Sequence, residues 1–77
     1  MKQLPVLSGK EILKALKTSG FVEISQRGSH VKLRRFSFGG TKTVIIPLHE
    51  ELAPGTLKSI LRQAGLTAED LWRLLEN

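Results

Sequence analysis

The first part of the chain carries the apolar spacing of an amphipathic helix. Ser8 and Glu11 form the S-x-x-E pattern of a capping box, in which two side chains satisfy free N–H groups at a helix start. Apolar residues then form one stripe between Ile12 and Leu16, and Gly20 is suited to end the helix in the left-handed conformation. The pattern predicts a helix between Ser8 and Gly20, with three cations outside its apolar stripe: Lys10, Lys14 and Lys17.

After this helix the apolar period changes to two, which is typical of β-strands. From Phe21 to Gln26, we expect Val22 and Ile24 on one face of a strand and Glu23 and Ser25 on the other. This segment is the first predicted strand.

A second strand is predicted after a short turn of Arg27, Gly28 and Ser29. In this strand Val31 and Leu33 share one face, and three polar or charged side chains share the other: His30, Lys32 and Arg34. The second strand is therefore expected to have a cationic face.

A third strand completes the predicted sheet. Gly39-Gly40 is a strong turn signal, and Lys42 to Ile46 then has the composition of a strand that ends at Pro47. Because the three strands are joined by short turns, the sequence predicts an antiparallel meander.

Two further helices are predicted towards the C-terminus. Pro54 suits the first turn of a helix whose apolar residues repeat at i, i+3, i+4 and i+7, and Gly65 is placed to end it. Thr67 and Asp70 resemble a second capping box, which is followed by a short apolar stripe: Leu71, Leu74 and Leu75. The order of elements predicts an α+β fold in a single domain, residues 1–77, with one sheet covered by helices.

The positive charge of the chain is unevenly distributed. The net charge is +5, and most of the 12 Lys and Arg lie before Glu50, where the only carboxylates are Glu11 and Glu23. Phosphate contacts dominate nucleic-acid affinity, so a polyanion is expected to meet this part of the chain. No apolar run approaches the ~20 residues of a membrane span, and the N-terminus lacks the apolar stretch of a signal peptide. We therefore expect a cytoplasmic protein without a membrane partner.

Histidine, with an ordinary pKa of about 6.5, is the side chain best suited to proton transfer at neutral pH. His30 follows Gly28-Ser29, where the backbone can approach a ligand closely, and shares a face with Lys32 and Arg34. RNA cleavage without a metal needs a base for the 2′-hydroxyl proton and cations for the developing phosphate charge. These side chains offer both, although an exposed strand also carries polar residues for solvation alone. His49 is open to three roles: a second acid, a phosphate contact or a cap for the following helix.

Other kinds of site lack support in the sequence. Two histidines without cysteine do not form a recognisable zinc ligand set, and no phosphate-binding loop or dinucleotide fingerprint is present. We therefore expect neither a metal nor a cofactor. Phe36, Phe38 and Trp72 can stack on bases, although a Trp on a helix is more typical of a core or an interface.

Two longer motifs stand out along the chain. The first is Arg27-Gly28-Ser29-His30, and the second runs from Ile46 to Thr67, in outline I-P-L-H-x-x-L-x-x-G-T-L-x-x-I-L-R-Q-A-G-L-T. These motifs, with their order and separation, resemble the HicA toxin family, and the likeness extends from about Ser8 to Leu71. The resemblance implies a fold like the double-stranded RNA-binding domain, with a helix, three strands and a helix, which agrees with the order predicted from periodicity.

The resemblance also implies an activity and two partners. Members of the family are ribonucleases that cut mRNA with the histidine of the G-S-H motif, here Gly28-Ser29-His30, and a HicB-type antitoxin holds them inactive. On this basis we expect His30 to act as general base in transesterification at the 2′-hydroxyl, with Lys32 and Arg34 stabilising the phosphorane. Further RNA contacts are expected from Lys10, Lys14 and Arg27.

Some positions depart from the family pattern. Val31 stands where some members have a second histidine or an aromatic residue, and Phe36-Ser37-Phe38-Gly39-Gly40 replaces a Pro-Asp-Gly type of turn. These departures bear on the preferred substrate.

Two other interpretations use the same residues differently. In the first, the protein is a non-catalytic RNA-binding module, and His30 and the cations only contact the RNA backbone. In the second, residues 57–75 form a DNA-binding helix-turn-helix. The would-be recognition helix begins with Ala68-Glu69-Asp70, which would present carboxylates to phosphates, so no direct DNA binding is expected.

Overall fold

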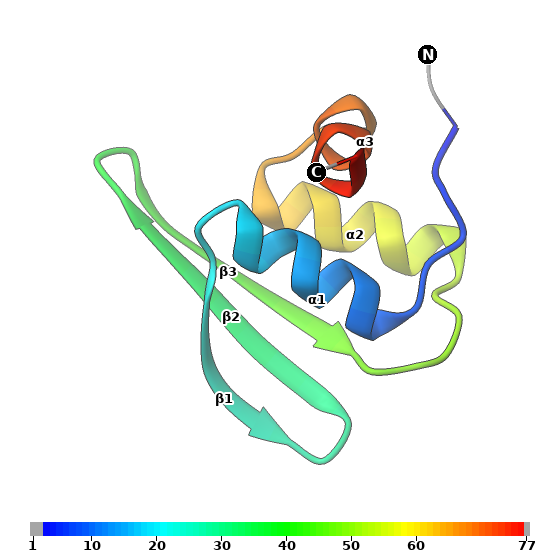
Figure 1. Ribbon diagram of the computed structural model, residues 1–77. Helices are drawn as coiled ribbons and strands as arrows, with labels where there is room; N and C mark the ends of the chain where they lie inside the picture. Colours follow the sequence, from blue (N-terminus) through cyan, green and yellow to red (C-terminus); the bar gives the residue numbers. More distant parts are fainter. Residues whose placement is uncertain (1–2, 77) are drawn as a thin grey trace.

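The computed structural model describes residues 3–76 and has the predicted order of helices and strands (Figure 1). The α+β fold expected from the sequence is thereby confirmed. The six elements are α1 (Gly9–Thr18), β1 (Val22–Arg27), β2 (His30–Ser37), β3 (Gly40–Pro47), α2 (Pro54–Ala64) and α3 (Ala68–Glu76).

Helix α1 begins at the predicted capping box. The Ser8 hydroxyl accepts a hydrogen bond from the Glu11 N–H at 3.1 Å, and the Glu11 carboxylate accepts one from the Ser8 N–H at 2.9 Å. After Ser19, Gly20 has a φ of 100°, which glycine adopts without steric cost. Both predicted ends of this helix are confirmed.

The three strands form an antiparallel sheet with β2 in the centre. In the register between β2 and β3, His30 lies opposite Pro47 and Ser37 lies opposite Gly40. Strand β3 is therefore longer than the predicted 42–46 segment, because Gly40 and Pro47 both pair with β2 and only residues 38–39 form the turn.

Strand β1 differs from its predicted alternation. Glu23 pairs with Leu33, whose side chain is buried, whereas Ser25 pairs with Lys32 on the opposite face. The prediction that Glu23 and Ser25 share a face is therefore wrong. The register shifts between these two residues, and the extra residue, Ile24, breaks the period of two.

Strand β1 lies at the edge of the sheet, and the helices do not cover its side chains. All of its residues are exposed, with Val22 at 53% and Ile24 at 44% exposure, whereas the preceding residue Phe21 is buried. The strand therefore contributes pairing to β2 but no core side chain of its own.

The helices cover one face of the sheet and leave the other face uncovered (Figure 1). Helix α2 packs against β3, and α1 packs against both β3 and α3. Within residues 3–76 the buried apolar side chains form one cluster. Its largest fully buried side chains are Ile12, Leu16, Leu33, Ile46, Leu57, Ile60, Leu71, Val31 and Val44.

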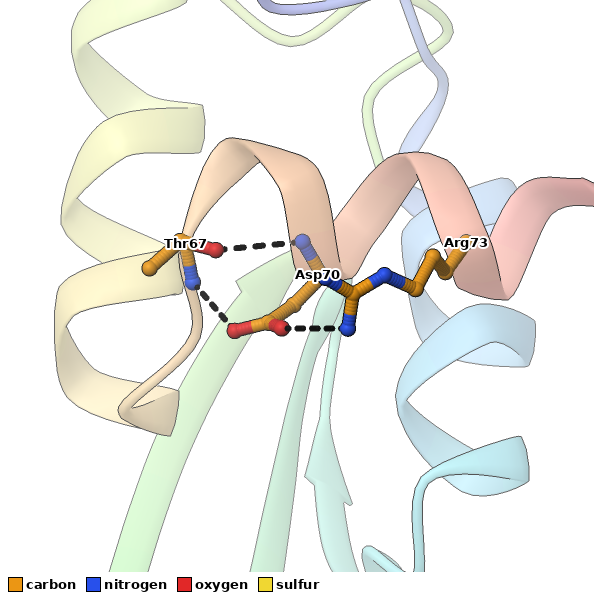
Figure 2. Close-up of polar contacts among 3 residues, drawn as sticks. All are labelled: Thr67, Asp70 and Arg73. Carbon is orange, nitrogen blue, oxygen red and sulfur yellow. Dashed lines mark hydrogen bonds and ion pairs between the residues drawn. The ribbon is translucent and has the colours of Figure 1, made fainter.

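The two C-terminal helices have the predicted ends. Pro54 lies in the first turn of α2, and Gly65 follows that helix with a φ of 73°. The Thr67 N–H donates to the Asp70 carboxylate at 2.9 Å, and the Asp70 N–H donates to the Thr67 hydroxyl at 3.1 Å (Figure 2). The Thr67 N–H and then the Thr67 hydroxyl, together with Arg73 at 3.5 Å, hold the pKa of the Asp70 carboxyl below its ordinary value. The second predicted capping box is confirmed.

Candidate functional site

The uncovered face of β2 carries His30, Lys32 and Arg34. Val31 and Leu33 between them are buried against the helices. Because successive side chains of a strand point to opposite faces, the three polar side chains project from the face that no helix covers. The predicted cationic face of this strand is confirmed.

Cross-strand pairing adds neighbours to this row. Arg27 of β1 lies opposite His30, so these two side chains share a face, and Pro47 of β3 flanks His30 on the other side. The Nε of Arg34 donates a hydrogen bond to the Thr43 hydroxyl at 3.1 Å. This hydrogen bond holds the guanidinium of Arg34 over the sheet.

The turn before His30 is held in place by hydrogen bonds to its backbone carbonyls. Its carbonyl at Ser29 accepts a hydrogen bond from the Leu48 N–H at 2.7 Å, and the Gln26 side-chain amide donates to the Gly28 carbonyl at 3.0 Å. Gly28 has a φ of 59°, and no atom lies within 4 Å of the position that a Cβ would take. The backbone beside His30 is therefore fixed and open to a ligand.

His49 lies where the end of β3 meets the start of α1. Its carbonyl accepts a hydrogen bond from the Gly9 N–H at 2.8 Å. A side chain at Gly9 would collide with the Pro47 carbonyl and the Leu48 Cα. The proposed role of His49 as a cap of the following helix is wrong, because the N-cap of α2 is Ala53 and has no side-chain hydrogen bond.

The structure does not place all predicted RNA contacts on one face. Lys10 and Lys14 are exposed on α1, in the layer that covers the sheet, whereas Lys32 and Arg34 project from the opposite face. Lys10 follows Gly9, so it lies near the same end of the sheet as the turn that precedes His30. Lys17 pairs with Glu23 at 3.3 Å.

Arg35 and Trp72 make structural contacts away from the row on β2. The Arg35 guanidinium donates to the Ser19 carbonyl at 3.3 Å and lies over the Phe21 ring, 5.2 Å from its centroid. The indole N–H of the half-buried Trp72 donates to the Gln3 carbonyl at 2.7 Å, so Trp72 packs the N-terminal segment rather than presenting a free ring.

Sequence reasoning missed Gly9 and Thr43. No local pattern marks Gly9, because the atoms that exclude a side chain there belong to Pro47 and Leu48. The pairing of Thr43 with Arg34 follows from the two-residue turn at 38–39, which sets the register of β2 and β3.

Other cavities and clusters do not involve the predicted residues. A groove of about 700 Å³ lies between residues 3–6, the start of α2 and the residues before α3. None of the predicted site residues lines it. Among residues 3–76 no three His, Cys, Asp or Glu side chains are placed to hold a metal ion, and none of the helices there is long and apolar enough to cross a membrane.

Comparison with protein families places this sequence in a known group. The model of the family described as HicA toxin of bacterial toxin-antitoxin matches residues 9–66. The chain belongs to the HicA toxin family. The match covers α1, the whole sheet and α2, including the G-S-H motif at residues 28–30, whereas α3 lies outside it. No curated protein gives a significant match.

Membership of the HicA family assigns a general role. The chain is the toxin of a toxin–antitoxin system, and an antitoxin is its partner. The uncovered row on β2 lies within the family match, which makes it the candidate site for the toxin's activity.

Proposed function

We propose that this HicA-family toxin is a metal-independent endoribonuclease that cleaves mRNA, with His30 as its catalytic residue. The observation that carries the proposal is the position of His30. It is exposed at one end of a row of cations, on the sheet face that no helix covers, within the G-S-H motif of the family match.

His30 acts first as a base. Its neutral imidazole takes the proton of the 2′-hydroxyl while the 2′-oxygen attacks the adjacent phosphorus. The bond from phosphorus to the 5′-oxygen breaks, and the imidazolium returns a proton to that oxygen. The products are a 2′,3′-cyclic phosphate and a free 5′-hydroxyl, so no water or further reactant is consumed in this step.

The cations stabilise the negative charge that builds on the phosphorane. Arg27 lies opposite His30 across the β1–β2 ladder, and Lys32 and Arg34 follow on the same face of β2. Cationic groups contribute most when they are held in place beforehand. The Thr43 hydroxyl holds Arg34 beside the strand, where it can bind a neighbouring phosphate of the same RNA. Lys10, near the same end of the sheet, and Lys14, further along α1, extend the RNA contact, and Gly28 and Ser29 let the strand approach.

A HicB-type antitoxin neutralises the toxin by covering the His30 face. The toxin and its mRNA substrate meet in the cytoplasm. Crosslinks from the antitoxin are expected on β2 and the turn at residues 28–29. Crosslinks confined to α3 would contradict occlusion of the site.

The competing function is a non-catalytic RNA-binding module. Within residues 3–76 the His30 imidazole makes no hydrogen bond or ion pair that would orient it as a base. A contact to phosphate needs no such orientation, and this favours the binding module. The two functions differ in what the replacement of His30 does to cleavage.

The test compares wild type with His30→Ala on a long single-stranded RNA in EDTA, followed by end-group analysis. We expect cleavage by wild type with cyclic phosphate ends, and a rate at least about 10²-fold lower for His30→Ala with RNA binding within a few-fold. Lys58→Ala is the control, because Lys58 is exposed on α2 and lies outside the row. Free 3′-hydroxyl ends would rule out the mechanism, and binding without cleavage by any variant would favour the RNA-binding module.

A further inference from the structure

The row on β2 continues beyond the cations into aromatic residues. Phe36 is the next residue on the same face after Arg34, and it is 65% exposed. Phe38 follows in the turn and is fully exposed. The hairpin of β2 and β3 that carries both rings projects beyond the helices (Figure 1). Exposure of large apolar side chains to water is unfavourable, so two exposed rings at one hairpin tip indicate a binding function.

The uncovered face has positive charge without a compensating carboxylate. Glu23 is the acidic residue of the three strands. It pairs with Leu33 on the covered face and forms its ion pair with Lys17 of α1. The face that holds Arg27, Lys32 and Arg34 therefore attracts a polyanion along β2 from His30 to Arg34.

We propose that an unpaired RNA strand lies lengthwise along β2, with its phosphates at Lys32 and Arg34 and its bases stacked on Phe36 and Phe38. The proposal rests on the function proposed above and adds an aromatic subsite to it. His30 and Phe36 are six residues apart on one strand, about 20 Å at the rise of a β-strand. The stacked bases thereby set the distance along the RNA to the bond that His30 cleaves.

The chemistry of the row selects an unpaired strand. A ring can stack on a base only when that base is not already stacked within a duplex, and sheet surfaces with exposed aromatics and cations bind single strands in this way. An acidic protein surface could also meet the cations. The continuous line from His30 through Lys32 and Arg34 to Phe36 matches a linear polymer that carries both phosphates and planar bases, and RNA is therefore the occupant proposed.

The test measures binding in the His30→Ala background, so that the RNA stays intact. The probe is a fluorescently labelled, unstructured single-stranded RNA, compared with a duplex of the same sequence. Phe36→Ala combined with Phe38→Ala is expected to weaken binding of the single strand about ten-fold or more. Duplex binding is expected to change less than about two-fold, because paired bases cannot stack on the rings.

Two further variants separate stacking from general damage. Phe36→Tyr keeps a ring and is expected to retain most of the single-strand affinity. Val6→Ala removes an exposed apolar side chain, 74% exposed, from the N-terminal segment and is expected to leave binding unchanged. A circular-dichroism melt checks that each variant is folded.

The outcomes distinguish this inference from the proposed function. Unchanged single-strand binding after removal of both rings overturns the inference, even if His30-dependent cleavage is observed. If the same double variant loses binding to the HicB-type antitoxin while its single-strand binding is unchanged, the rings belong to the protein partner, which also overturns the inference. Ring-dependent RNA binding without any cleavage by wild type supports the subsite while the ribonuclease proposal fails. Failure to bind RNA at all overturns both.

Discussion

At the scale of single residues, Gly9 determines how α1 meets the end of the sheet. Its N–H bonds the His49 carbonyl, and its missing side chain leaves room for the backbone of Pro47 and Leu48. The Leu48 N–H in turn bonds the turn that precedes His30. One glycine thus connects the first helix, the segment after β3 and the turn at the candidate site.

Replacing this glycine is expected to destabilise the fold. Gly9→Ala forces a methyl group into the backbone of Pro47 and Leu48, and the resulting shift should lower the free energy of unfolding by about 1–3 kcal/mol. Urea denaturation followed by circular dichroism measures this change.

Gly55→Ala is the matched control for Gly9→Ala. Gly55 also lies in the first turn of a helix, but no atom lies within 4 Å of the position that a Cβ would take there. Alanine at this position should raise the free energy of unfolding by about 0.4–1 kcal/mol, because it restricts the unfolded chain. Equal effects of the two substitutions would contradict the steric role of Gly9.

At the scale of elements, β2 serves both the core and the site. Val31 and Leu33 bury one face, and the central position gives β2 a hydrogen-bonded neighbour on each side. Side chains on the opposite face of such a strand are therefore held on a fixed backbone, which favours a preorganised site.

The capping box of α3 is expected to make stability depend on pH. The pKa of Asp70 is lowered, so its carboxylate contributes stability that is fully present above the ordinary value of 3.8 and is lost as pH falls through the lowered value. Wild type should therefore be more stable than Asp70→Asn at about pH 6, and the difference should shrink as the pH falls below 3.8. Thermal melts across this range measure the difference.

Glu76→Gln provides the control for the cap. Glu76 ends α3, far from the hydrogen bonds that Thr67 makes with Asp70. Its replacement should not reproduce the pH dependence of Asp70→Asn. A constant difference between wild type and Asp70→Asn at all pH values would show that the charge of Asp70 plays no part in the cap.

At the scale of the whole molecule, cations lie on both layers of the fold. Lys10 and Lys14 belong to the helical layer, whereas Lys32 and Arg34 belong to the uncovered sheet face. An RNA strand on the sheet that passes round the end near His30 would meet both groups, because the N-terminus of α1 is joined to that end by the Gly9–His49 hydrogen bond.

Removal of individual cations is expected to change the salt dependence of RNA binding. Replacing Lys10, Lys14 or Arg27 with alanine removes one phosphate interaction, so binding should weaken and the slope of log K against log salt should fall by about 0.7. Titrations of the His30→Ala background over a range of salt concentrations measure the slope. Lys58→Ala, an exposed lysine of α2 beside the apolar groove, is the control and should leave the slope unchanged. If Lys10→Ala and Lys14→Ala leave the slope unchanged, the RNA binds only on the sheet and does not reach α1.

Local sequence patterns determined much of this structure. Capping boxes at Ser8 and Thr67 and a glycine after α2 have signatures a few residues long, because the groups that they satisfy belong to the same helix end. The alternation in β2 likewise placed His30, Lys32 and Arg34 on one face, since a strand points successive side chains to opposite sides.

Tertiary structure alone decided which surfaces are covered and which residues meet. The bulge at Ile24, the exposure of Val22, and the junction of Gly9 with His49 all depend on segments distant in sequence. The separation of Lys10 from Lys32 by the sheet depends on which face α1 covers. Periodicity reports which residues share a face of one element, but the face that is buried is selected by packing between elements, and no single segment encodes that choice.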